Sequence, residues 1–271
     1  MKVLYLDDSS KFDSESLVIA LGFFDGFHKA HMALLNEALR IAKEKNKRSA
    51  ILTFNESIAS IIKGEKFEYL TSIDDKVNLS LKLGFDELIL IEPTKTLINM
   101  SHIDFYNKFL KDADTLVLGF DYSFGKDRLG NASFLKEMHK NVIVIDEIKE
   151  GSIKIGTYEI KKALSGGDIA KANSLLGRAY SIKGFLYKRN KYYALTIFDY
   201  YIPRSFLYHL HIVGPNIDVE MDSKIKRLDE GGGIVIKPID YDLSKLKIEK
   251  RKVYEVFFTQ SSSKSLWLFI L

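Results

Sequence analysis

Short apolar runs rich in β-branched residues alternate with longer segments of helical period over the first half of the chain. Apolar runs of about five residues are typical of strands buried on both faces, as in parallel sheets whose crossover helices cover both sides. We assign five such runs to strands, at residues 17–21, 50–54, 87–91, 115–119 and 141–145. The sequence therefore predicts an α/β domain with a parallel sheet.

The second half has a different texture. After about Tyr180, β-branched and aromatic segments are separated by turns, at 192–198, 207–213, 234–236 and 253–258. This spacing predicts a small β-rich, barrel-like domain. Two helices near 159–164 and 168–176 are expected to close the first domain, which gives domains of 1–180 and 181–271. The apolar stretch 265–271 is expected to be a last strand.

The composition limits the kinds of catalytic and metal sites that the chain can form. The chain of 271 residues has no cysteine, which excludes disulfides, a thiolate zinc site and a cysteine nucleophile. Acidic residues at Asp7 and Asp8 come too early for a secretory signal, and no apolar run is long enough to cross a bilayer, so a cytoplasmic protein is expected. The net charge of +4 is spread along the chain and fits a phosphorylated small molecule as well as a nucleic acid.

One strand-to-helix turn stands out, because residues 22–31 read GFFDGFHKAH. It is expected at the carboxyl edge of the sheet, where open α/β sheets bind ligands and where amides at a helix start face an anion. His28 and His31 share one side of the first helical turn. A protonated histidine there opposes the helix dipole by roughly 0.3–1 kcal/mol, so the pair suits a site where phosphoryl charge develops. Ordinary half-buried histidines are the plainer alternative, which the two glycines and the β-to-α position disfavour.

This turn resembles the pattern G-x-F-D-G-x-H-x-G-H of the bacterial bifunctional riboflavin kinase/FAD synthetases. The resemblance implies a Rossmann-like nucleotidyltransferase domain at the N-terminus. The positions that match are Gly22, Phe24, Asp25, Gly26, His28 and His31. It implies that His28 and His31 are catalytic and that the other four positions bind substrate. Ala30 replaces the family's last glycine, and its added methyl is expected to affect affinity more than chemistry.

A second block, residues 118–131, reads LGFDYSFGKDRLGN and is similar to the family's V-G-F-D-F-x-F-G-x-x-R-x-G-N. The resemblance implies that this loop holds the flavin and the adenine nucleotide through Asp121, Phe124 and Gly125. A plain aromatic turn is the alternative. Residues 70–72, with Lys76 and 83–86 after them, are similar to the family's L-T-S…K…L-G-x-D stretch.

Two segments depart from the family. Its I-S-S-T-x-I-R, whose hydroxyls and arginine bind ATP phosphates, is here Ile155-Gly156-Thr157-Tyr158-Glu159-Ile160-Lys161. The resemblance assigns phosphate binding to Thr157, Tyr158 and Lys161. Lysine keeps the charge without the planar fork that grips two phosphate oxygens. The family's T-F-x-P-H-P is reduced to residues 53–57, TFNES.

The second domain lacks two kinase signatures of the family. Neither the P-T-A-N segment nor the glutamate in an L-R-x-E-x-K-F context is found, and residues 185–193 run from one predicted strand into the next where P-T-A-N should lie. We therefore predict a degenerate riboflavin-kinase-like β domain.

The resemblance as a whole implies an FMN adenylyltransferase that makes FAD and pyrophosphate from FMN and ATP. Mg²⁺ is expected to come with ATP, with no dedicated protein ligands, and FMN and FAD are the flavin substrate and product. Three alternatives stay open: a non-catalytic flavin or nucleotide binder derived from that family, a nucleotidyltransferase with another acceptor, and a barrel that binds proteins. Nucleic acid and membrane partners are not expected, and protein partners are unknown.

Overall fold

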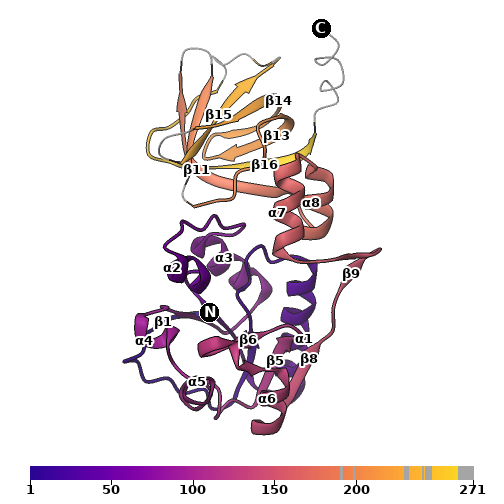
Figure 1. Cartoon of the computed structure of the whole chain (residues 1–271). Helices are drawn as coiled ribbons and strands as arrows, with labels where there is room; N and C mark the ends of the chain where they lie inside the picture. Colours follow the sequence, from indigo (N-terminus) through magenta and orange to yellow (C-terminus); the bar gives the residue numbers. More distant parts are fainter. Residues whose placement is uncertain (190–191, 198, 229–231, 240, 242–245, 262–271) are drawn as a thin grey trace. The chain divides into compact units, whose positions relative to one another are not determined.

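The computed structural model describes residues 1–189, 192–197, 199–228, 232–239, 241 and 246–261. The chain forms two compact units (Figure 1). The first comprises Met1–Phe67 and Ile73–Lys154, and the second comprises Glu68–Ser72 and the chain from Ile155 onward. The last strand predicted at 265–271 lies outside the described residues. Among the described residues, no helix combines the length and the apolar character that a membrane span requires.

The first unit is built on a six-stranded parallel sheet, as the apolar runs predict. In spatial order the strands are β1 (Lys2–Leu6), β4 (Glu87–Ile91), β3 (Arg48–Phe54), β2 (Leu17–Leu21), β5 (Thr115–Gly119) and β8 (Val142–Ile145). All five predicted strands are present, and only β3 and β8 differ at their first residues. The sequence analysis did not assign β1, an edge strand of which only Leu6 is fully buried.

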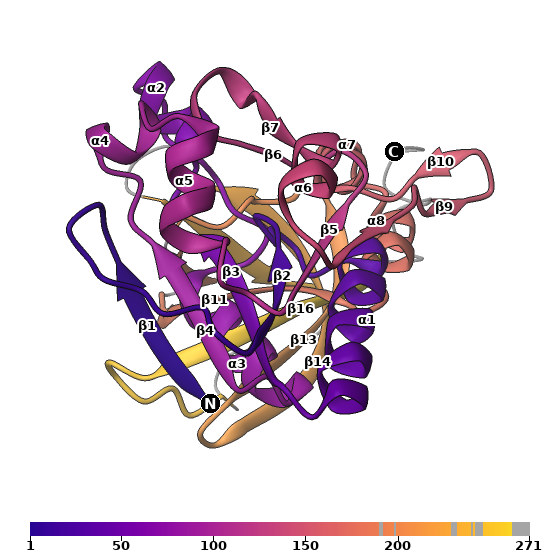
Figure 2. The ribbon, with the colours of Figure 1, turned by 90° about the horizontal axis from the view of Figure 1, so that it is seen from below.

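Helices cover both faces of this sheet. Val18 and Ala20 of β2 pack with the face that holds α1 (Lys29–Lys45) and α3 (Ile73–Leu83). The alternate residues of β2 pack with the face that holds α4 (Lys95–Ile98), α5 (His102–Phe109) and α6 (Ala132–Met138). Figure 2 shows α1 and α5 on opposite sides of the sheet. A strand buried on both faces has no polar alternation, which is why β2 reads LVIAL.

The strand order places a switch point between β2 and β5. From β2 the chain crosses through α1 to β3 on one side, and β5 pairs with β2 on the other side. Ligands of open α/β sheets bind outside the carboxyl ends of the strands at such a point. Short elements follow β3, β5 and β8: α2 (Ile58–Lys63), β6 (Ser123–Phe124), the 3₁₀ turn η1 (Lys126–Arg128), β7 (Gly130–Asn131) and the hairpin of β9 (Lys149–Glu150) and β10 (Ile153–Lys154).

The second unit is a closed antiparallel barrel with two helices, as predicted in kind. Its strands, in order around the barrel, are β11 (Tyr180–Lys188), β12 (Tyr193–Ile197), β15 (Gly233–Pro238), β14 (Ile217–Arg227), β13 (Leu207–Gly214) and β16 (Val253–Ser261). Alternate residues of β11 and β12 are buried and fill the interior. The segment at 192–198, which contains β12, was predicted from its β-branched and aromatic residues and from the spacing of the turns.

The division of the chain differs from the predicted 1–180 and 181–271. The helices α7 (Thr157–Gly166) and α8 (Ile169–Leu176) belong to the unit that contains the barrel. The Asn173 side chain of α8 donates to the carbonyls of Phe258 at 2.8 Å and Thr259 at 3.2 Å. These long-range bonds cannot be read from local sequence. The helix junction itself is as predicted, because Gly167 ends α7 with a φ of 80° and the Asp168 carboxylate caps α8.

Candidate active site

The turn after β2 has an unusual backbone that the surrounding core supports. Phe24, Gly26 and Phe27 have φ values of 50°, 103° and 43°. Positive φ costs of order 1–3 kcal/mol at a bulky residue and persists only where the surroundings enforce it. Both phenylalanine rings are buried against α1, and a Cβ on Gly22 would lie 2.8 Å from the Phe24 ring. The turn is therefore a preformed element, held in shape by its own aromatic side chains.

The two histidines lie at the start of α1, as the spacing predicts. His28 is the N-cap, and its Nδ1 accepts a hydrogen bond of 3.2 Å from the backbone N–H of His31. The rings stack with centroids 3.6 Å apart and an angle of 15° between their planes. Because Nδ1 is an acceptor, a neutral His28 carries its proton on Nε2. This capping bond fixes which nitrogen of His28 can donate to a ligand.

His31 is held neutral in the absence of an anion. Burial lowers its pKa well below the ordinary value, and the charges of His28 and Lys76 lower it further. Its Nδ1 is enclosed and has no hydrogen-bond partner among the residues that the structure describes. The sequence argument started from protonated histidines and missed this effect, because burial cannot be read from the spacing. A phosphate at the site would reverse the trend, since a nearby negative charge raises the pKa of histidine.

Lys76 is a residue of this site to which sequence reasoning gave no role. It lies on α3 with 1% of its surface exposed, and its ammonium donates to the carbonyls of Phe23 at 2.8 Å and Phe54 at 3.3 Å. Burial lowers its pKa to about 8, and the charge of Asp25 opposes that shift. Thr53 Oγ1 also donates to the Phe23 carbonyl, at 3.0 Å. The sequence signal that could have identified Lys76 is its match to the lysine of the family's L-T-S…K…L-G-x-D stretch.

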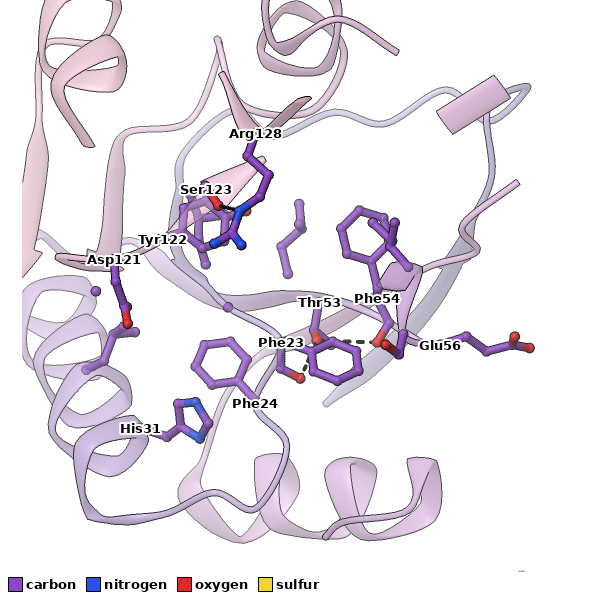
Figure 3. Close-up of a pocket in the computed structure, with 17 residues that line it drawn as sticks. Phe23, Phe24, His31, Thr53, Phe54, Glu56, Asp121, Tyr122, Ser123 and Arg128 are labelled. Atoms are coloured by element: carbon purple, nitrogen blue, oxygen red, sulfur yellow. Dashed lines mark hydrogen bonds between the residues drawn. The ribbon is translucent and has the colours of Figure 1, made fainter. Parts of the chain in front are cut away.

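A cavity of about 360 Å³ opens beside the turn. Its walls come from the turn, from the residues after β3 and from the block after β5. Figure 3 shows Phe24 and His31 on one side and Tyr122, Ser123 and Arg128 on the other. The predicted site residues in its walls are Gly22, Phe24, His31 and Asp121. The two motifs that lie about 100 residues apart in the sequence thus meet at the switch point of the sheet.

The remaining predicted residues of the turn support this wall from behind. Asp25, Gly26 and His28 do not line the cavity, and Asp25 and His28 are buried at 1% and 4% exposure. Ala30, which replaces the family's glycine, lies within α1 and does not have a positive φ. Alanine therefore fits this backbone without strain.

The second block contributes charge to the rim of the cavity. Asp121 forms an ion pair of 2.7 Å with Lys154 of β10, and Lys29 of α1 forms one of 2.6 Å with Glu150 of β9. The hairpin is thus tied to both motifs. Arg128 lines the cavity, and its Nε donates to Ser123 Oγ at 2.7 Å. The sequence match included this arginine, but sequence reasoning did not single it out.

Phe124 and Gly125 lie in the scaffold of this block, and neither lines the cavity in the described part of the chain. The Phe124 ring is buried among aromatic side chains of α5 and α6, with Phe105 at 5.3 Å between centroids. Gly125 has a φ of 72°, and a Cβ there would lie 2.5 Å from Cα of His102. The sequence assigned both residues to substrate binding, whereas their contacts are those of residues that shape the loop.

The altered segment 155–161 lies in the second unit. Gly156 is the N-cap of α7 and gives it no side-chain cap, and the next residues, Thr157 and Tyr158, begin the helix with Tyr158 exposed at 74%. Lys161 was expected to bind phosphate. Its ammonium donates to the carbonyl of Glu68 at 2.6 Å and lies 5.6 Å from the centroid of the Tyr201 ring.

The segment Glu68–Ser72, which contains the L-T-S match, is anchored in the same unit. The Glu68 carboxylate pairs with Arg227 of β14, and the Tyr200 hydroxyl donates to Ser72 Oγ at 3.0 Å. Lys161 therefore belongs to the set of contacts that holds this segment. Such a role depends on residues more than 60 positions away and could not be deduced from the local motif.

The described residues contain no group of three or more histidine, aspartate or glutamate side chains that could hold a metal ion.

Comparisons with known proteins agree with this geometry. The family model of FAD synthetase matches residues 10–158, more than half of the chain. A bifunctional riboflavin kinase/FMN adenylyltransferase of Listeria monocytogenes is 32% identical over 194 residues, which cover 68% of this chain and 62% of that protein. A protein of the same organism named FAD synthetase is 27% identical over 193 residues, which cover 69% of this chain and 78% of that protein.

The bifunctional relatives are longer than the region they share with this chain. The chain spans 62% and 57% of the relatives from Listeria monocytogenes and Bacillus subtilis. A crystal structure of a protein named macrolide-efflux protein, from Streptococcus pneumoniae, covers 100% of this chain and 96% of its own, with a TM-score of 0.82 and 20% identity. At this identity the likeness establishes the two-unit fold and nothing more. The match of the family model to more than half of the chain shows that the chain belongs to the FAD synthetase family.

Proposed function

We propose that this chain is an FMN adenylyltransferase. A phosphate oxygen of FMN attacks the α-phosphorus of ATP, the bond from that phosphorus to the bridging oxygen breaks, and FAD and pyrophosphate form. No covalent enzyme intermediate is required. The observation that carries the proposal is the meeting of the turn and the block after β5 around one cavity at the switch point of the sheet.

The residues of the turn provide the electrostatic part of the reaction. The imidazoles of His28 and His31 and the amides at the start of α1 would stabilise charge on the phosphoryl oxygens. The turn needs no rearrangement to present them, because its strained backbone is already formed. A preorganised site of this kind lowers the barrier without reorganisation during the reaction. The phosphate that enters would raise the pKa of His31. A larger fraction of its imidazole would then be protonated and able to donate a hydrogen bond to the phosphate.

The remaining predicted residues would position substrates. Asp121, which lines the cavity, and Asp25, which is buried next to the cavity-lining Phe24, are proposed for this role. Arg128 adds a guanidinium at the cavity, where it suits a phosphate or carbonyl oxygen. Thr157, Tyr158 and Lys161 are proposed to hold the departing phosphates, with the grip of Lys161 reduced by its bond to the Glu68 carbonyl. Mg²⁺ would enter with ATP and neutralise phosphate charge. We place the reaction in the cytoplasm, with no nucleic acid or membrane partner.

The test is the reaction itself. Purified protein with FMN, ATP and Mg²⁺ should yield FAD and pyrophosphate, separated by chromatography. The double variant His28→Ala, His31→Ala is the control. FAD formation by the native chain that does not exceed the control would reject the proposal. Nicotinamide mononucleotide and phosphopantetheine in place of FMN test other acceptors, and turnover with either in preference to FMN would assign a different transferase.

A second candidate, a non-catalytic flavin binder, is favoured by one observation. Lys161 replaces the family's arginine, and its ammonium is already bound to a backbone carbonyl. Calorimetry separates the two functions. Tight FMN binding without ATP binding supports the binder, and binding of both nucleotides supports the enzyme.

We also propose that the barrel lacks riboflavin kinase activity. The support is the missing P-T-A-N segment, because β11 ends at Lys188 and β12 begins at Tyr193 where that segment should lie. Riboflavin and ATP should give no FMN. Formation of FMN from these two compounds would refute this part of the proposal.

A further inference from the structure

The ammonium of Lys76 is a buried cation directly beneath the turn. Lys76 is the one lysine among the described residues with less than a tenth of its surface exposed. Its side chain runs from α3 to the carboxyl ends of two neighbouring strands, where it reaches the carbonyls of Phe23 and Phe54. Its Nζ also lies 4.4 Å from the centroid of the Phe23 ring, which in turn packs edge-on against Phe67 at 6.0 Å.

A buried ammonium is a poor choice for stability alone. Desolvation of a charge is costly, and a packed apolar side chain of similar volume often stabilises a core more. The shift of the Lys76 pKa to about 8 reports this cost, which the charge of Asp25 offsets only in part. A residue that is unfavourable in the core needs another explanation, and its contacts supply one.

We infer that Lys76 is a positioning residue that holds the turn between β2 and α1 in its anion-binding shape. Phe23 immediately precedes the positive-φ residue Phe24, so a bond to the Phe23 carbonyl fixes the point where the strained backbone begins. The bond to the Phe54 carbonyl ties the same ammonium to the end of β3, which makes the neighbouring strand the fixed support.

Charge adds to the mechanical role. Lys76 interacts electrostatically with Asp25 in the turn and with His31 in the first turn of α1. A cation enclosed behind the turn lowers the pKa of His31, and it makes the region more favourable for an incoming phosphate. The lysine itself does not line the cavity, but it contacts two residues that do, Phe23 and Phe54. Its effect on adenylyl transfer, which rests on the proposed function, would therefore act through the turn.

The test compares two substitutions on α3 in the full chain. Lys76→Met removes the charge and both donated bonds while keeping an unbranched side chain of similar length. Ser80→Ala is the matched control, because Ser80 is buried one turn further along the same helix. Its hydroxyl has no hydrogen-bond partner among the described residues. Three quantities are measured: kcat and KM for FAD formation, the unfolding midpoint, and amide hydrogen exchange of residues 22–35 without substrate.

For Lys76→Met we expect kcat to fall about 10- to 100-fold, because misplaced groups lose the benefit of preorganisation. Amide exchange in residues 22–35 should accelerate at least about tenfold, because the local structure that protects these amides is weakened. The unfolding midpoint should stay the same or rise. Ser80→Ala should match the native chain in kcat and in exchange.

Three results would overturn the inference: a kcat within about twofold of the native value, unchanged exchange of residues 22–35, or exchange that accelerates equally across the whole chain. If Lys76→Met does not fold, Lys76→Leu, which also removes the charge and both donated bonds, is judged by the same criteria. If the native chain makes no FAD, the proposed function fails, whereas the exchange comparison still decides the role of Lys76, because it needs no substrate.

Discussion

Two helix starts in this chain were expected to bind the same nucleotide, and they are built differently. At the start of α1, His28 caps the helix with its side chain, the preceding turn has three residues with positive φ, and the rings of Phe24 and Phe27 are buried. At the start of α7, Gly156 caps the helix without a side chain, and Tyr158 is exposed.

A lysine supports each region, again in contrasting ways. Lys76 holds the turn before α1 from a buried position, and Lys161 of α7 holds the Glu68–Ser72 segment of its own unit. The first helix start is a rigid site whose geometry exists before any ligand arrives. The second helix start offers backbone amides and the side chain of Lys161, whose ammonium is already bound to the Glu68 carbonyl. We propose that the turn with the two histidines retains the family's arrangement more fully than the segment that was expected to grip the leaving phosphates.

The largest expected effect comes from the histidines of the rigid start. His31→Ala should lower kcat for FAD formation by about 10²–10³-fold, the usual loss when one preorganised electrostatic group is removed. Lys161→Ala should lower it by about tenfold or less. His211→Ala, a substitution on the barrel, serves as the control and should leave the rate unchanged. Equal losses in His31→Ala and Lys161→Ala would show that the two helix starts contribute alike.

A pH titration of stability should single out Lys76. Its pKa is about 8 in the folded chain and 10.5 in the reference state, so the folded chain binds fewer protons between these values. Stability from this group therefore rises with pH from about 8 to about 10.5, by up to about 3 kcal/mol. Chemical denaturation of the native chain and of Lys76→Met across this range measures the difference between their free energies of unfolding. This difference should become smaller as the pH rises. A difference that does not depend on pH would mean that Lys76 is not buried as a cation.

A matched pair of glycine substitutions compares the rigidity of the two starts. Gly22→Ala places a methyl 2.8 Å from the Phe24 ring, whereas Gly156→Ala meets nothing within 4 Å and has a φ of −168°. The first should destabilise the chain by about 1–3 kcal/mol, typical of overpacking. The second should change the free energy of unfolding by less than about 0.5 kcal/mol. A similar loss in both variants would contradict the distinction between a packed turn and an open one.

Local sequence pattern was sufficient for a strand buried on both faces and for the histidine pair. The run at 17–21 predicted β2 to the residue, and His28 and His31 fall on one helical turn as their spacing requires. Prediction from the sequence failed where the role of a side chain is set by contacts with residues far away in the chain. Nothing near Lys161 indicates Glu68, nothing near Phe124 indicates the rings of α5, and the pairing of Asn173 with β16 moved the domain boundary.

The smallest effect should come from restoring family residues at the open start. Gly156→Ser has room for its side chain, and a serine N-cap accepts from a first-turn amide, which stabilises α7 by a few tenths of a kcal/mol. Combined with Lys161→Arg, whose fork can grip two phosphate oxygens, it should lower KM for ATP by about 3- to 10-fold at nearly constant kcat. Steady-state kinetics with varied ATP and saturating FMN measures both constants. A rise in kcat with KM unchanged would place these residues among the groups that act in the transition state, and the open start would then be as much a part of the catalytic machinery as the histidine turn.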